Sequence, residues 1–207
     1  LAMSSAASDV YKRQISGFPC DYDEIMNCVQ KHSSIFLPSN EKQKKLGRIL
    51  IAADSAHSFG ATYKNKRSGS FTDVSCFSFH AVKNLTTAEG GAVCFNLPEP
   101  FDHEEIYKEF VTITLHGQSK DALAKTKKGA WKYDVVTPGY KCNMTDIQAA
   151  IGLVELDRYA ENLARRKEIF HAYDSVFSKR DWALLPAHET SDKTSSHHLY
   201  LLRIKDI

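Results

Sequence analysis

One lysine, Lys83, lies in a polar loop between two short apolar runs of the chain. The first run contains Ser78, and the second follows the Gly90-Gly91 pair. A lysine just past a strand end can form a Schiff base with an aldehyde cofactor, while a nearby hydroxyl and backbone N–H groups hold that cofactor's phosphate. Lys83 and Ser78 are candidates for this chemistry. The alternatives are a solvated loop lysine and a serine buried in a strand.

An acidic residue follows another apolar run. Residues 49–53 are continuously apolar, as expected for a strand buried on both faces of a parallel sheet, and Asp54 comes next. In open α/β sheets, ligands bind beyond the carboxyl ends of the strands. A carboxylate at that place can pair with the protonated nitrogen of a pyridine ring. The alternative for Asp54 is an N-cap or turn residue.

Three motifs resemble one protein family. Residues 54–60 read DSAHSFG, residues 77–91 read FSFHAVKNLTTAEGG, and residues 137–153 read TPGYKCNMTDIQAAIGL. Together they resemble the DegT/DnrJ/EryC1/StrS family of sugar aminotransferases, which are pyridoxal-phosphate (PLP) enzymes. The sequences of the three motifs most resemble those of the UDP-4-amino-4-deoxy-L-arabinose–oxoglutarate aminotransferase branch, which acts in lipid A modification. The resemblance extends from about residue 17 to the end of the chain.

The resemblance implies roles for five residues. Lys83 carries the Schiff base and later acts as a base, and Asp54 keeps the pyridine nitrogen protonated. His57 supports Asp54 or the hydroxyl side of the cofactor, and Ser78 binds its phosphate. Asn143 reaches the phosphate of the neighbouring subunit's cofactor, which implies a homodimer. The alternatives are a structural role for His57 and helix capping for Asn143.

The resemblance also implies the fold class, an α/β protein of PLP-dependent transferase fold type I, as in aspartate aminotransferase. We expect residues 15–158 to be part of a PLP-binding large domain with α/β/α layers. We expect residues 159–207 to form a linking helix and the start of a small C-terminal α+β subdomain.

The first residues of the chain do not resemble the family. Residues 1–14 are small and polar without periodicity, and we expect them to be a non-native or disordered leader. Family members carry, before the matched part, an N-terminal segment with a phosphate-binding turn and a residue that stacks on the pyridine ring. This chain shows no counterpart, so we expect it to be a fragment that lacks the N-terminal part of the protein.

Local patterns predict the remaining elements. Residues 33–47 are polar and predict a surface loop, and the long helical pattern of residues 145–177 is uneven near Arg158, which predicts a bend there. The other expected elements are helices at 21–31 and 102–114 and strands at 73–79, 92–96, 182–185 and 199–204.

A lysine-rich segment, residues 118–132, has two interpretations. It contains five lysines and a single acid, Asp121. It is either a solvated loop or a flap whose lysines meet the diphosphate of a nucleotide-sugar.

Composition excludes several classes of protein. The chain is 43% hydrophobic and 25% charged with a net charge of +2, which gives no argument for nucleic acid as a partner. No apolar run approaches membrane-spanning length. The five cysteines are odd in number and lack C-x-x-C spacing, and the nine histidines lack ligand spacing. We therefore expect reduced thiols, a cytoplasmic protein and no metal site.

The leading hypothesis is a PLP-dependent aminotransferase that moves an amino group from glutamate to a nucleotide-linked keto-sugar. The product would serve cell-surface polysaccharide or lipid A sugar biosynthesis, and the fragment alone is expected to be inactive. One alternative is a PLP-dependent sugar dehydratase of the same family, although members of that kind replace the lysine with histidine. Another is a non-catalytic remnant that only dimerises or binds nucleotide-sugar. An upstream reading frame with the phosphate turn and stacking residue would favour the enzyme.

Overall fold

The computed structural model describes residues 9–119 and 132–206, with side chains from residue 14 onward. The chain divides into two compact units. The first combines Leu1–Asn96 with Ile147–Ile207, and the second is Leu97–Asp146. The C-terminal residues thus cluster with the first part of the chain.

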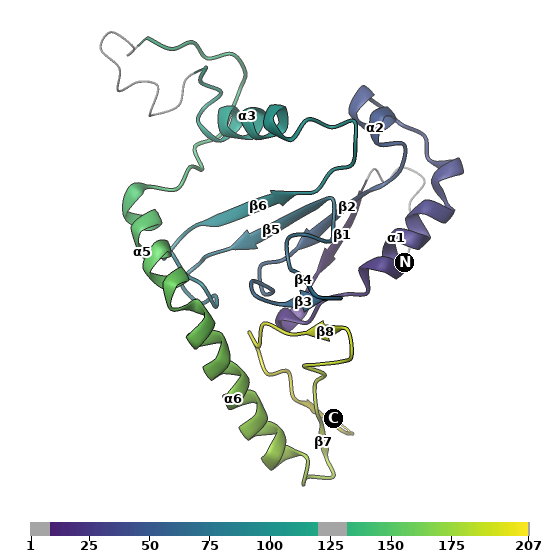
Figure 1. The fold of residues 1–207 in the computed structure, drawn as a ribbon, viewed down its shortest axis with the longest axis vertical. Helices are drawn as coiled ribbons and strands as arrows, with labels where there is room; N and C mark the ends of the chain where they lie inside the picture. Colours follow the sequence, from purple (N-terminus) through teal and green to yellow (C-terminus); the bar gives the residue numbers. More distant parts are fainter. Residues whose placement is uncertain (1–8, 120–131, 207) are drawn as a thin grey trace. The chain divides into compact units, whose positions relative to one another are not determined.

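The first unit is built on a four-stranded sheet with the order β1-β2-β5-β6 (Figure 1). Strands β1, β2 and β5 are parallel, whereas β6 is antiparallel to β5. The carboxyl ends of the three parallel strands therefore meet at one edge of the sheet. The strands are β1 Asp9–Arg13, β2 Leu50–Asp54, β5 Val74–Ser78 and β6 Gly91–Phe95.

Strand β1 corrects an expectation about the start of the chain. We expected residues 1–14 to be a leader outside the fold. In the structure, however, β1 pairs with β2 along the whole length of both strands. Gln14 follows as a fully buried residue. The hydrophobic pattern does not reveal this strand because an edge strand is held by backbone hydrogen bonds whatever its side-chain alternation.

Helix α1, Tyr22–Lys31, packs on the sheet as the sequence predicts. Asp21 caps it by accepting a hydrogen bond from the backbone N–H of Glu24 at 3.3 Å. Its apolar face joins a buried cluster with β2 and the neighbouring hairpin. The buried members of that cluster are Tyr22, Val29, Ile49, Ile51, Ala53 and Tyr63.

The segment of residues 33–47 is more regular than the surface loop we predicted. It holds a 3-10 turn, Ser33–Ile35, and a short helix, α2 Glu41–Leu46. Asn40 caps α2 by accepting from the N–H of Gln43, and Gly47 ends the helix in the left-handed conformation with φ 69°. Its side chains are mostly exposed, so the helix forms on local capping signals that a reading of polarity alone overlooks.

The long helical stretch breaks where the sequence predicts. Helix α5 is Asp146–Asp157 and α6 is Tyr159–Phe177, with Arg158 between them. The apolar pattern of this stretch is only partly buried: in α6, Tyr159 and Phe170 are buried but Tyr173 is 46% exposed, and α5 has no buried side chain. The apolar side chains of α5 that are exposed are Ile147, Ile151, Leu153, Val154 and Leu156.

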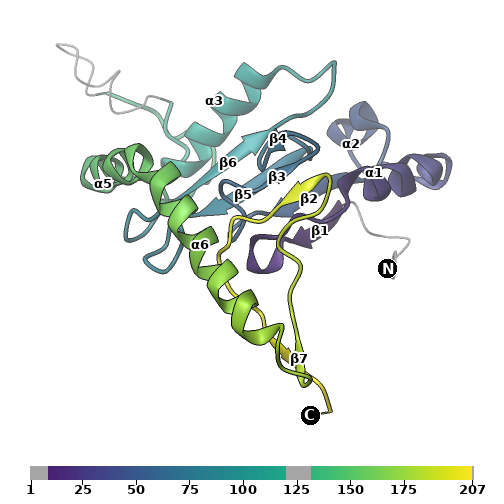
Figure 2. The same ribbon diagram turned by 60° about the horizontal axis from the view of Figure 1, so that its bottom comes forward.

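The C-terminal residues run back along α6, as both ribbon views show (Figure 2). Strands β7, Ala183–Leu184, and β9, Arg203–Ile204, pair with each other. Strand β8, Lys193–Thr194, which the sequence did not predict, joins the hairpin of β3, Thr62–Tyr63, and β4, Lys66–Arg67. This three-stranded sheet ties the C-terminal segment to the residues that follow Asp54.

The second unit contains α3, His103–Thr114, which Asp102 caps by accepting the N–H groups of Glu104 and Glu105. None of the side chains of α3 is buried, although its apolar residues are spaced to form one face of the helix. Most of the lysine-rich segment, residues 120–131, lies outside the described residues. Within the described ranges, no helix combines the length and the apolar character needed to cross a membrane.

A buried ion pair joins the starts of β2 and β5. The two terminal nitrogens of the Arg48 guanidinium, Nη1 and Nη2, donate to the two carboxylate oxygens of Asp73 at 2.6 and 2.7 Å. One of those oxygens also accepts the backbone N–H of Ile51 at 2.8 Å. The side chain of Asp73 is only 3% exposed, so its charge is satisfied entirely by these donors.

We predict that Asp73→Ala lowers the free energy of unfolding by about 3–5 kcal/mol, because it leaves the charge of Arg48 without its partner in a largely buried place. Urea denaturation of the purified protein measures the loss. The matched control is Asp23→Ala, which removes an ion pair with Lys64 whose side chains are both about half exposed. A loss for Asp73→Ala no larger than that of the control would contradict the prediction.

Candidate active site at the carboxyl edge of the sheet

Asp54 ends strand β2 with a side chain that is 4% exposed. Its Oδ1 atom accepts the backbone N–H of Ala56 at 3.1 Å, and its backbone carbonyl accepts the N–H of Gln14 at 3.0 Å. In the next residue, Ser55 accepts a hydrogen bond from the side chain of Gln14 at 3.0 Å. A carboxylate is therefore fixed at the carboxyl edge of the sheet, where α/β proteins bind ligands.

Ser78 shares this edge and this face with Asp54. The parallel register places Asp54 opposite Cys76, and Ser78 follows Cys76 by two residues on the same side of β5. This face of the sheet is exposed at Cys76 and at Val93, which is 40% exposed, whereas Phe77 on the other face is buried. The structure thus brings two predicted site residues together on an exposed face.

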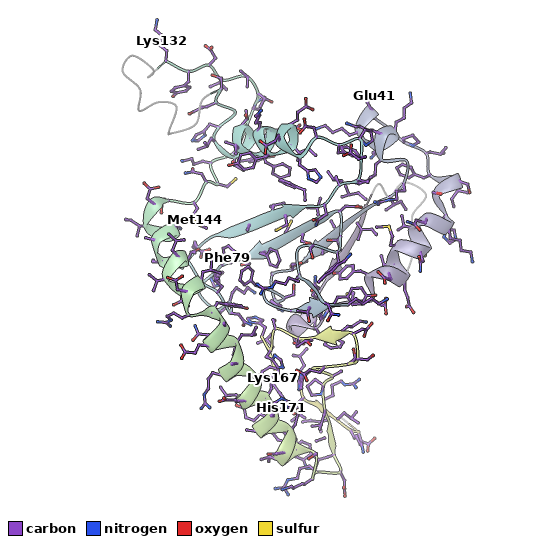
Figure 3. All side chains as sticks on the ribbon, viewed as in Figure 1. Glu41, Phe79, Lys132, Met144, Lys167 and His171 are labelled. Atoms are coloured by element: carbon purple, nitrogen blue, oxygen red, sulfur yellow. The ribbon has the colours of Figure 1, made fainter. Side chains whose placement is uncertain are left out.

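Lys83 lies in the loop after β5, as predicted. Its backbone N–H donates to the carbonyl of His80 at 2.9 Å. The next two residues, Asn84 and Leu85, are buried, and the N–H of Thr87 donates to the carbonyl of Phe79 at 2.9 Å. Figure 3 labels Phe79 where this loop begins. The loop is anchored on both sides of the half-buried lysine, so the position of its backbone is well defined.

His57 lies in the turn that follows Asp54. Its ring packs on the ring of His198 with centroids 4.3 Å apart, and its carbonyl accepts the hydroxyl of Ser196. Two residues later, the carbonyl of Phe59 accepts the hydroxyl of Tyr159 from α6. The turn that carries His57 is thus held by α6 and by the C-terminal segment.

The C-terminal segment of residues 195–198 is the part of this site that the sequence did not predict. All four residues are buried. The N–H of Ser196 donates to the carbonyl of Gly17 at 3.1 Å, and Asn84 contacts both Ser196 and His198. The sequence shows only an adjacent histidine pair before an apolar run, which gives no sign of contact with residues more than a hundred positions earlier.

Burial lowers the pKa of His198 to about 4, and the charges of His57 and Lys83 act in the same direction. The imidazole is therefore neutral at physiological pH.

Asn143, the fifth predicted site residue, lies in the second unit, just before α5. Its side chain is exposed, accepts a hydrogen bond from the ammonium of Lys141 and donates to the carbonyl of Met144 at 3.3 Å. Its role at the cofactor of a neighbouring subunit stays a prediction.

The groups at this edge fit pyridoxal phosphate by their chemistry. They comprise a fixed carboxylate, a hydroxyl with loop N–H groups, and an amine on an anchored loop, which suit a pyridine nitrogen, a phosphate and an aldehyde respectively. In residues 9–119 and 132–206, no three His, Cys, Asp or Glu side chains gather as metal ligands.

Within the C-terminal segment of residues 195–198, His197 lies in an aromatic cluster. It is 1% exposed, and its ring centroid is 5.0 Å from that of Phe170 and 5.9 Å from that of His188. Neither ring nitrogen has a hydrogen-bond partner among the described residues. Burial lowers its pKa to about 4; nearby His188, Lys167 and His171 act in the same direction, and Glu189 opposes them. Figure 3 labels Lys167 and His171 on α6.

Comparisons with known proteins agree with this chemistry. A model described as the DegT/DnrJ/EryC1/StrS aminotransferase family matches residues 41–206. The spore coat polysaccharide biosynthesis protein SpsC of Bacillus subtilis is 33% identical over 207 residues, which cover 99% of this chain and 47% of SpsC. A UDP-4-amino-4,6-dideoxy-N-acetyl-beta-L-altrosamine transaminase of Campylobacter jejuni is 33% identical over 186 residues, 89% of this chain and 42% of that protein.

A solved structure confirms the predicted fold class. Spr1654 of Streptococcus pneumoniae, described as a sugar aminotransferase and solved in its PLP form, matches with a TM-score of 0.91 and 45% identity. The match covers 99% of this chain and 50% of that one. The architecture is therefore the α/β fold of type I PLP-dependent transferases, and this chain spans about half the length of the proteins it matches.

We predict that acid destabilises the protein through His197 and His198. Their pKa values of about 4 lie below the ordinary value of 6.5, so between these pH values the unfolded chain binds protons that the folded chain does not. Each histidine should remove about 1.4 kcal/mol of stability per pH unit as the pH falls through this window. Denaturation series between pH 7 and pH 4 measure the slope.

The His197→Phe variant should flatten that slope because phenylalanine fills the site without titrating. The control is His32→Gln, which changes an exposed histidine at the C-cap of α1 and removes no buried imidazole. If the stability of His197→Phe depends on pH as steeply as that of the native protein, His197 does not cause the loss of stability in acid.

Proposed function

Because this chain belongs to the DegT/DnrJ/EryC1/StrS aminotransferase family, we propose that the full-length protein transfers an amino group to a nucleotide-linked keto-sugar, with PLP as cofactor and glutamate as donor. One observation carries the proposal. The parallel pairing of β2 and β5 places Asp54 and Ser78 on one face and at one edge of the sheet, and the loop of Lys83 continues from there.

The roles of the side chains follow from their chemistry. Bound PLP supplies an electron sink for the carbanion that forms when the donor loses its Cα proton. Asp54, fixed at its edge, would hold the proton on the pyridine nitrogen, and Ser78 with loop N–H groups would bind the phosphate. Lys83 would bind the aldehyde carbon through Nζ and, once displaced, take the Cα proton as a base.

The relatives support the substrate class. One is named for polysaccharide biosynthesis and another for a transaminase of a UDP-linked amino sugar. We propose a nucleotide-linked keto-sugar of cell-surface polysaccharide or lipid A biosynthesis. Such activated sugars are small charged molecules of the cytoplasm, which is where we place the reaction. His57 would support Asp54 or the cofactor from the turn that the C-terminal segment holds.

We predict that borohydride reduction of the full-length, PLP-loaded protein attaches the cofactor irreversibly to Lys83, because a Schiff base is reduced to a stable secondary amine. Peptide mapping by mass spectrometry identifies the labelled residue. Label on another lysine, or none, would overturn the proposed function.

Asp54→Ala is the matched variant in that experiment. It should keep the label on Lys83 but lower turnover by several orders of magnitude, since the pyridine nitrogen loses the carboxylate that keeps it protonated. Normal turnover of Asp54→Ala would show that Asp54 is only a turn residue.

We further predict that the active protein is a homodimer in which Asn143 serves the partner's site. Mixing an inactive Lys83→Ala variant with an inactive Asn143→Ala variant should then restore activity, because one of the two sites in a mixed dimer carries both native residues. Unmixed variants provide the baseline. An active monomer, or no recovery in mixed dimers confirmed by mass spectrometry, would contradict the prediction.

A further inference from the structure

The carboxamide of Asn84 joins the lysine loop to the C-terminal segment. Its Nδ2 group donates to the carbonyl of Ser196 at 2.7 Å, and its Oδ1 atom lies 2.8 Å from Nδ1 of His198. Burial raises the pKa of the neighbouring Tyr159 to about 12, and Asn84 acts in the opposite direction. Asn84 is itself only 9% exposed, so this bridge lies inside the protein.

These partners determine which nitrogen of His198 carries the hydrogen. The carbonyl of Ser196 can only accept, so the NH2 group of Asn84 must face it, and the amide oxygen must then face His198. An amide oxygen only accepts hydrogen bonds, so Nδ1 of His198 is the donor. The other nitrogen, Nε2, then bears the lone pair of a neutral imidazole.

The surroundings of His198 disfavour a second proton. Its ring packs on His57, the charge of Lys83 acts on it from the loop after β5, and Arg166 of α6 donates to its backbone carbonyl at 3.4 Å. The charges that act on the ring are thus cationic or those of another histidine, and burial adds to them. Among the described residues the structure records a hydrogen bond for Nδ1 of this ring and none for Nε2.

We propose that Asn84 orients His198 so that Nε2 presents a hydrogen-bond acceptor to the substrate beside Lys83. The group it binds is a donor, either a hydroxyl of the sugar or the amino group of the donor substrate, and not a carboxylate, which the lone pair would repel. His198 is then a substrate-binding residue, and Asn84 is a positioning residue that acts through it. This inference rests on the proposed function, because it takes the Lys83 edge as the active site.

The tautomer is measured without cofactor or turnover. In the full-length protein labelled with ¹⁵N-histidine, the His198 signals, identified by their loss in His198→Asn, should show a protonated Nδ1 and an unprotonated Nε2 at pH 7. Asn84→Asp replaces the amide by a carboxylate of the same shape, which should protonate both nitrogens at that pH. Asn96→Asp is the control, since the amide of Asn96 bridges the carbonyls of Gly69 and Thr72 without a histidine.

Two substitutions of His198 then test the acceptor. His198→Asn keeps a donor near the Nδ1 position but has nothing at Nε2, so KM for the substrate it binds should rise roughly tenfold, the effect of one lost hydrogen bond. His198→Gln places an amide oxygen near the Nε2 position and should recover part of that loss. A rise for the keto-sugar alone identifies the sugar hydroxyl, whereas a rise for glutamate alone identifies the amine.

Either of two results overturns the inference. One is an Nε2-protonated or doubly protonated His198 in the native protein at pH 7, and the other is an unchanged KM for both substrates in His198→Asn. These outcomes are separate from the proposed function, which borohydride labelling of Lys83 tests. If Lys83 is labelled and His198 has the other tautomer, only the role of His198 and Asn84 fails.

Discussion

The parallel pairing of β2 with β5 is the constraint on which the site depends. Parallel strands end at the same edge, so Asp54 and Ser78 come together although a hairpin and two turns separate them in the chain. The ion pair of Arg48 and Asp73 acts at the opposite ends of the same strands, and the carboxylate also binds the N–H of Ile51. The register of β2 and β5 aligns Asp54 with Ser78, and the Arg48–Asp73 ion pair stabilises this register at the end of the strands away from the candidate site.

Several buried neutral groups help to hold the loops beyond this edge. Asn84, Thr87 and Ser196 are buried and bind backbone carbonyls, and Ser55 accepts the side chain of Gln14. Buried neutral hydrogen bonds fix geometry without adding charge to the site. These neutral bonds fix the loops around Asp54 and Lys83, and the guanidinium of Arg166 adds a charged donor to the carbonyl of His198.

Much of this arrangement could be predicted from the sequence because it depends on short-range patterns. The apolar run before Asp54, the strand before Lys83 and the helix expected over residues 21–31 each leave a local signal, and the structure has these elements where they were expected. Strand β1 leaves no such signal, because its pairing is made by backbone groups. Asn84 and His198 are polar and lie 114 positions apart in the sequence, so the periodicity of apolar residues cannot predict their contact.

The exposed side chains show where the reasoning from periodicity reaches its limit. An apolar pattern predicts that one face of a helix or strand is buried, but it does not identify the element that buries it. Helix α5 has the composition of a buried helix, yet its Ile147, Leu153 and Val154 are exposed in this chain, as are Cys76 and Val93 on the face of the sheet that carries Asp54. Exposed apolar surface of this extent is costly in water. The chain spans about half the length of its relatives. The apolar pattern that predicted the core elements therefore also indicates that the exposed face of α5 and the Asp54 face of the sheet would be stabilised by contacts that cover them.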